Sequence, residues 1–208
     1  MSTLLKQVQI IDTTSTFHLK VVDILIENQT IKQIASEINV AADQVIPASG
    51  MMLMPGWVDV MADFSEPGYE HKESIATGLA SATAGGFQHV FVVPNTQPAI
   101  QNKSMVEYIV NKGKYLQGNV YPIGAISKDI QGKDLAEMMD MHHAGAIAFS
   151  DGWKPVQNTQ LLLKALEYVK AFDGIIIQMP INSSLAAGGL MNEGFNSVRF
   201  GMPGIPTI

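Results

Sequence analysis

The sequence of 208 residues contains no cysteine. Disulfide bonds and thiolate metal ligands are therefore excluded, and the absence fits the cytoplasmic protein that we expect. No apolar run reaches the roughly 18 residues of a membrane-spanning helix, and the first residues lack the features of a signal peptide. Charged residues make up only 15% of the chain, with a net charge of −6. This balance predicts no basic surface for nucleic acid or for an anionic membrane.

Apolar residues, by contrast, make up 47% of the chain, which is enough for a sizeable core in one domain or two small ones. Residues 6–11 and 18–35 place apolar side chains between polar ones, which predicts short β-strands with a tight turn at Glu27-Asn28-Gln29. An extended pattern continues over residues 45–54. We therefore predict a small β-module over residues 1–54.

After Pro55-Gly56 the pattern changes to short apolar strands that alternate with amphipathic helices. The expected strands are 57–60, 89–93, 120–126, 146–149 and 175–177. The expected helices are 72–84, 103–116, 133–143 and 157–172. Gly85-Gly86 is typical of a helix end. Continuous apolar strands separated by helices indicate parallel β/α units, so the predicted class is α/β.

Two architectures fit this alternation, a doubly wound sheet and a (β/α)8 barrel. A phosphate-binding G-x-G-x-x-G motif would favour the doubly wound sheet, but none follows the first strand. The β-module ahead of the first parallel strand favours the barrel. A complete barrel takes roughly 250 residues. Residues 55–208 have room for four or five units, so we expect the N-terminal part of a barrel.

Four separated stretches carry a specific resemblance. Residues 55–74 (PGWVDVMADFSEPGYEHKES) are similar to the signature of the dihydroorotases, which are cyclic amidohydrolases of the amidohydrolase superfamily. Residues 84–96, 145–152 and 185–206 resemble later segments of the same family, in the same order. The resemblance implies a TIM-type (β/α)8 barrel preceded by a small β-sandwich module. It also implies a role in pyrimidine biosynthesis, with one or two zinc ions at the carboxyl ends of the barrel strands.

The departures from the family pattern fall on the expected metal site. The family carries two histidines on its first strand, two residues apart so that both face the barrel mouth. Met61 and Asp63 stand at these positions, and a thioether is a poor ligand for Zn²⁺. Ser65 replaces the arginine that would bind the substrate carboxylate. On the expected fifth strand, Gln178 or Met179 stands where the family has a histidine.

Few residues remain for chemistry. Asp63 and Asp151 are the plausible metal ligands, whereas a zinc site needs three or four. Asn95 matches the asparagine that contacts substrate in the family. We therefore predict no catalytic residue, no metal ligand and no cofactor, with Asn95 as a vestigial substrate contact.

Three functions follow from this pattern. The first is a non-catalytic homologue, either a pseudoenzyme or a structural partner of aspartate carbamoyltransferase. The second is an active zinc-dependent cyclic amidohydrolase that converts carbamoyl aspartate and dihydroorotate, with Asp63 and Asp151 as ligands and Asp151 as the catalytic carboxylate. The third is a small-molecule binding module around Asn95.

The incomplete barrel also carries an expectation about assembly. A half-barrel exposes unpaired strand edges, which favour association. We therefore expect a homo-oligomer or a hetero-assembly with aspartate carbamoyltransferase, or else a chain that is a piece of a longer protein.

Overall fold

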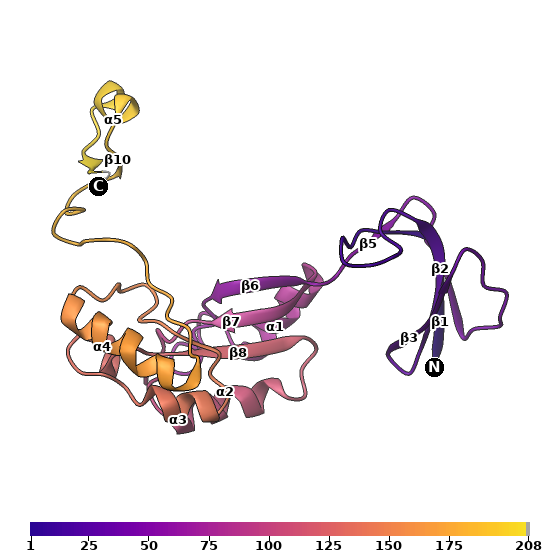
Figure 1. The fold of residues 1–208 in the computed structure, drawn as a ribbon, viewed down its shortest axis with the longest axis horizontal. Coiled ribbons are helices and arrows are strands. Elements are labelled where there is room, and N and C mark those ends of the chain that lie inside the picture. The colour runs from indigo at the N-terminus through magenta and orange to yellow at the C-terminus, as the bar shows by residue number, and fades with distance from the viewer. Residues whose placement is uncertain (207–208) are drawn as a thin grey trace. The chain divides into compact units, whose positions relative to one another are not determined.

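The computed structural model describes residues 1–206, whose fold is drawn in Figure 1. The chain divides into two compact units, the first comprising Met1–Gly56 and the second beginning at Trp57. The boundary lies two residues beyond the predicted end of the β-module. Within residues 1–206, no helix combines the length and the apolar composition that crossing a membrane requires.

The first unit is a five-stranded sheet in which β3, β2, β1 and β4 lie side by side and β5 also pairs with β1. The strands are β1 (Ser2–Ile10), β2 (Val21–Glu27), β3 (Thr30–Ala35), β4 (Gln44–Pro47) and β5 (Met52–Leu53). Asn28 and Gln29 join β2 to β3 with φ angles of 50° and 63°. Positive φ at both central residues is the geometry of a type I′ hairpin turn, which confirms the turn expected there.

A buried carboxylate fixes an irregularity in β1, where the pairing with β2 shifts register between Leu5 and Val8. Asp23 is 1% exposed and accepts hydrogen bonds from the backbone N–H groups of Gln7 and Ile38, at 2.9 Å each. It also pairs with the Lys6 ammonium group. Burial opposes ionisation of Asp23, but these donors outweigh it and lower its pKa. The carboxylate therefore supplies an acceptor for the backbone N–H of Gln7, which lies within the register shift.

The second unit contains a parallel sheet in the order β6-β7-β8-β9, with helices along one face (Figure 1). Its elements are β6 (Trp57–Ala62), α1 (Ile75–Ala84), β7 (Phe87–Val92), α2 (Lys103–Gly113), β8 (Asn119–Gly124), the 3₁₀ turn η1 (Lys128–Ile130), α3 (Met138–His143), β9 (Ala148–Phe149), α4 (Thr159–Val169) and the 3₁₀ turn η2 (Lys170–Phe172). One buried cluster joins sheet and helices, including Val90 of β7, Leu79 of α1 and Ile109 of α2. This alternation confirms the predicted parallel β/α units.

Helix α1 begins at Ile75, three residues later than predicted. The Ser74 side chain accepts a hydrogen bond from the backbone N–H of Thr77, and the Thr77 side chain accepts one from the backbone N–H of Ser74. This reciprocal capping box fixes the first turn at Ile75. At the other end Gly86 has φ +88°, so the predicted glycine stop is confirmed.

The helix predicted over 133–143 was wrong in its first half. Residues 134–136 instead pair with the chain after β8, through a hydrogen bond from Lys128 N to Asp134 O and another from Ala136 N to Ile126 O. Only α3, from Met138, remains helical. Tertiary backbone pairing here overrides the helical spacing of the side chains.

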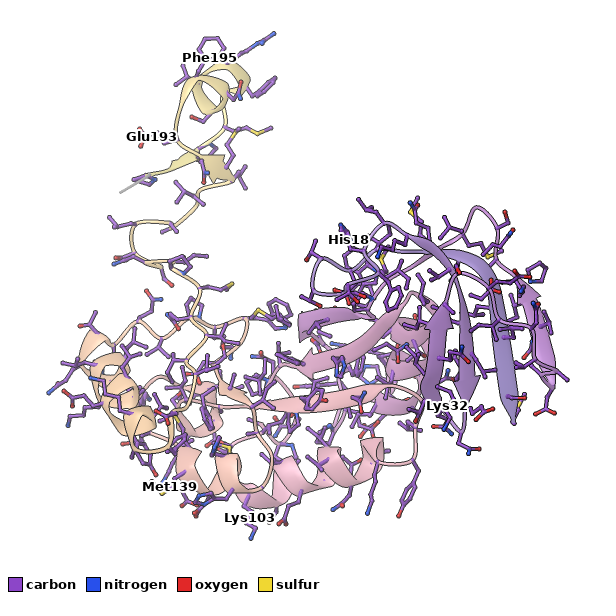
Figure 2. All side chains as sticks on the ribbon, turned by 45° about the vertical axis from the view of Figure 1, so that its right-hand side comes forward. His18, Lys32, Lys103, Met139, Glu193 and Phe195 are labelled. Atoms are coloured by element: carbon purple, nitrogen blue, oxygen red, sulfur yellow. The ribbon has the colours of Figure 1, made fainter. Side chains whose placement is uncertain are left out.

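The fifth barrel strand, predicted at 175–177, is reduced to a single parallel bridge between Phe149 and Ile176. Beyond it, the described chain forms β10 (Met191–Asn192), α5 (Phe195–Phe200) and β11 (Gly204–Ile205), none of which was predicted. Figure 2 shows Phe195 on α5, where it is 79% exposed. The six-residue helix is too short for a side-chain periodicity to reveal it in the sequence.

Candidate functional site

The carboxyl ends of the parallel strands bring the predicted site residues to one edge of the sheet. Asp63 follows β6, Asn95 follows β7 and Asp151 follows β9. Ala62, between Met61 and Asp63, packs against the cluster between the sheet and the helices. That Met61 and Asp63 share one face of the strand stays a prediction from their spacing.

Asp63 is exposed and hydrogen-bonded mainly to its own loop. Its Oδ1 accepts from the backbone N–H of Ser65 at 2.7 Å and lies 3.3 Å from the Ser65 hydroxyl. Its Oδ2 lies 3.4 Å from Nε1 of Trp153, which makes a long hydrogen bond across the sheet edge. Ser65 itself has φ +58°, a left-handed backbone that the aspartate side chain stabilises by this local bond.

Asp151 is 2% exposed and both of its carboxylate oxygens face protein donors. Oδ1 accepts from the backbone N–H groups of Ile126 at 3.0 Å and Ser127 at 2.9 Å. Oδ2 accepts from the Ser127 hydroxyl at 2.5 Å. Burial raises the pKa of Asp151, and the hydrogen bonds from Ser127 and Ile126 offset only part of that effect. The side chain thus ties the end of β9 to the end of β8.

Asn95 makes the corresponding link from β7 to β9. Its Nδ2 donates to the backbone carbonyl of Asp151 at 3.2 Å, and its Oδ1 accepts from the backbone N–H of Trp153 at 3.1 Å. Gly152 lies between these two contacts with φ +59°. A Cβ atom at Gly152 would lie 1.7 Å from Oδ1 of Asn95, so the approach requires glycine.

Two residues stand where the resemblance places the fifth-strand histidine, and the first of them is hydrogen-bonded within the chain. Gln178 accepts from the backbone N–H of Val156 at 3.2 Å and donates to its carbonyl at 3.1 Å. Met179 is half-buried, and its thioether is again a soft, uncharged donor. Neither side chain supplies the imidazole that a zinc site of this family uses.

The side chains at the expected metal positions do not fit a zinc ion. Across residues 1–206, no three histidine, aspartate or glutamate side chains come together in a way that could hold a metal. Asp151 directs both carboxylate oxygens at N–H and O–H donors, and Met61 is uncharged. Zn²⁺ needs three protein ligands even where a water completes the shell. Of Asp63 and Asp151, the two ligands that the alternative function would use, Asp63 is the exposed one.

A second buried carboxylate, Glu66, was not predicted as an important residue. It is 3% exposed, accepts from the backbone N–H of Ile75 and the Tyr108 hydroxyl at 2.7 Å each, and pairs with the Lys112 ammonium group. Burial opposes its ionisation, but these donors together lower its pKa. Glu66 anchors the loop after β6 to α1 and α2. The Glu-Pro-Gly of residues 66–68 is the sequence signal that could have identified it.

An open cleft of about 490 Å³ lies beside this edge of the sheet. Its lining includes Tyr69, Asn95, Gln131, Trp153 and Lys154. Each polar atom of the Asn95 amide already makes a hydrogen bond to the backbone of residues 151–153, so a ligand in the cleft would share these atoms.

The sequence is similar to those of known proteins. A family model described as Dihydro-orotase-like matches residues 50–208. A protein named Dihydroorotase from Acetivibrio thermocellus is 44% identical over 190 residues, covering 90% of this chain and 44% of that protein. Another Dihydroorotase, from Syntrophus aciditrophicus, is 43% identical over 211 residues, covering 100% of this chain and 49% of that protein. The chain therefore spans about half the length of the curated relatives it matches.

Solved structures show the same fold. L-hydantoinase (dihydropyrimidinase) from Arthrobacter aurescens matches with a TM-score of 0.69 and 20% identity, covering 84% of this chain and 39% of that one. A D-hydantoinase matches with a TM-score of 0.69 and 19% identity, covering 89% of this chain and 41% of that one. These neighbours confirm the predicted α/β barrel class, of which the sheet β6–β9 is a partial barrel.

Proposed function

This chain belongs to the dihydroorotase-like family, and on that premise we propose that it is a non-catalytic dihydroorotase homologue of pyrimidine biosynthesis. The observation that supports the proposal most is the state of Asp151. In an active homologue this carboxylate would ligate metal and pass a proton. Here both of its oxygens accept hydrogen bonds from Ile126 and Ser127.

The first-strand positions support the same proposal. Met61 and Asp63 offer one exposed carboxylate where the family has two imidazoles, and Ser65 offers no guanidinium for a substrate carboxylate. Loss of one residue that only orients a metal ligand costs roughly 10–100-fold in affinity or activity. Replacement of the ligands themselves has a larger effect.

The test measures zinc content and ring opening together. We expect purified protein to hold no stoichiometric zinc and to open dihydroorotate no faster than buffer at neutral pH, with or without added zinc. Asp151→Ala serves as the control, because a genuine activity would fall with it. Stoichiometric zinc that a chelator removes along with the activity would refute the proposal.

The second candidate is an active zinc-dependent cyclic amidohydrolase, and the 44% identity to a protein named Dihydroorotase favours it. In that case Asp63 and Asp151 would hold the metal and Asp151 would be the catalytic carboxylate. It requires Asp151 to exchange its present partners for a metal ion. The same zinc and ring-opening measurements decide between the two functions.

We further propose that the chain acts within an assembly, as a homo-oligomer or as a structural partner of aspartate carbamoyltransferase. Strand β6 is one of the two end strands of the described sheet, and Trp57, Val58 and Val60 are each about half exposed along it. Such an edge favours pairing with another chain. Size-exclusion chromatography of the chain alone and with aspartate carbamoyltransferase from the same organism tests this, and co-elution supports the hetero-assembly.

A further inference from the structure

Within residues 57–206, side chains and backbone groups join the strand ends of this unit, and no cluster of metal-binding side chains is found there. Asn95 connects the end of β7 to the backbone of residues 151–153, and Asp151 connects the end of β9 to the backbone after β8. Each contact spans a long separation in sequence, between 24 and 58 positions. The three strand ends therefore form one hydrogen-bonded group.

We infer that Asn95, Asp151 and the backbone of Trp153 form a clasp that holds the ends of β7, β8 and β9 in place without a metal ion. The inference rests on the proposed non-catalytic function and assigns its two polar residues a structural role. In this role Asn95 and Asp151 are positioning residues, since their hydrogen-bond partners belong to the chain itself.

Packing around the clasp supports this role. Asp151 is 2% exposed and Gly152 lies so close to Asn95 that a Cβ atom would overlap its Oδ1. The Ser127 hydroxyl both donates to Asp151 and accepts from the backbone N–H of Gly132 at 2.8 Å. A buried network in which each member has its partners fixes one backbone arrangement. A metal ion in place of these bonds would leave the N–H groups of Ile126 and Ser127 without acceptors.

The variant that tests the clasp is Asn95→Asp. It keeps the size and the acceptor for Trp153 N–H but removes the donor to the Asp151 carbonyl and places a carboxylate beside it. The matched control is Asn119→Asp, since Nδ2 of Asn119 also donates to a backbone carbonyl, that of Gln88 at 3.1 Å, away from the clasp. We expect Asn95→Asp to lower the melting temperature by about 4–8 °C and the control by about 2 °C or less. Equal effects of the two variants would overturn the clasp.

Independence from metal is tested on the unaltered 208-residue chain. We expect the same melting temperature in EDTA and in millimolar zinc, and slow hydrogen exchange at the backbone N–H groups of Ile126, Ser127 and Trp153 in both. A zinc-dependent rise in melting temperature that Asp151→Asn abolishes would overturn the inference. So would protection of these amides only when zinc is present. The exchange measurement needs no variant, so it stands even if Asn95→Asp fails to fold.

The outcomes separate this inference from the proposed function. Ring-opening activity in a protein whose amides are protected in EDTA would refute the non-catalytic function and leave the clasp standing. An inactive protein in which Asn95→Asp behaves like Asn119→Asp would refute the clasp alone.

Discussion

At the scale of single residues, Glu66 shows how a buried carboxylate makes stability depend on pH. Its folded-state pKa lies below the ordinary value of 4.5, because the donors from Lys112, Ile75 and Tyr108 outweigh the effect of burial. The ionised form is therefore favoured by folding. The stability it contributes is present above pH 4.5 and is lost as pH falls through the lowered folded-state pKa.

We predict that Glu66→Gln lowers the free energy of unfolding by about 2 kcal/mol at pH 7 and flattens its decline below pH 4.5. Urea unfolding at several pH values measures both effects. Glu107→Gln is the control, because Glu107 pairs with Lys103 on the same helix in an exposed ion pair at 3.6 Å. The control should change stability by about 0.5 kcal/mol or less. A parallel decline with acid in Glu66→Gln and in the unaltered chain would contradict the prediction.

Gly152 allows a second prediction at this scale. Gly152→Ala introduces a Cβ atom 1.7 Å from Oδ1 of Asn95 and also places alanine at φ +59°. We expect the free energy of unfolding to fall by about 3 kcal/mol, because the overlap with Asn95 adds to the backbone strain. Gly132→Ala shares the strain, at φ +67°, but its Cβ atom meets nothing within 4 Å. Chemical denaturation should give about 1–2 kcal/mol for this control. Equal losses would show that Asn95 moves aside freely.

Residue identity alone predicted part of the candidate site. The substitutions at Met61, Asp63 and Ser65 were visible in the sequence, because a single short motif holds all three. The partners of Asp151 were not visible, because Ile126 and Ser127 lie 25 and 24 positions away and two of the three hydrogen bonds come from their backbone N–H groups. Backbone donors leave no trace in side-chain patterns, so the role of this carboxylate required the structure.

At the scale of elements, α1 depends on one apolar side chain. Leu79 is fully buried in the cluster between α1 and the sheet. We predict that Leu79→Ala lowers the free energy of unfolding by about 2–5 kcal/mol, through lost burial and the cavity left behind. Leu163→Ala in α4 is the control, since Leu163 is 57% exposed, and it should cost about 0.5 kcal/mol or less. Thermal or urea unfolding compares the two variants, and similar losses would place Leu79 outside the core.

The sequence predicted the elements whose side chains carry a clear period or a glycine stop. The order of β6 to α4 and the turn at Asn28-Gln29 were found in this way. Residues 133–137 were assigned wrongly to a helix. Their backbone pairs instead with the chain after β8, through hydrogen bonds from Lys128 N to Asp134 O and from Ala136 N to Ile126 O, and helical spacing does not reveal such pairing. The short elements β10, α5 and β11 offered too few residues for a pattern.

At the scale of the whole molecule, the exposed outer strand β6 predicts association. Val60 is 56% exposed on that strand. We expect the chain to elute above its monomer mass and Val60→Lys to shift it toward the monomer, because a charged side chain on an edge strand opposes pairing. Light scattering coupled to size-exclusion chromatography measures the mass. Leu163→Lys, at an equally exposed position of α4, should leave the assembly unchanged. A monomer at all concentrations would contradict the prediction.

The clasp also has a consequence for the order of events during synthesis. The Asn95 amide has its partners 56 and 58 positions later in the chain. At 5–20 residues per second the ribosome needs roughly 3–12 s to add that many residues. Until then the Asn95 amide is hydrated, although β6, α1 and β7, which precede it in the sequence, have already been synthesised. The edge at which the ends of β7, β8 and β9 meet is therefore completed only after the chain has been made as far as Trp153.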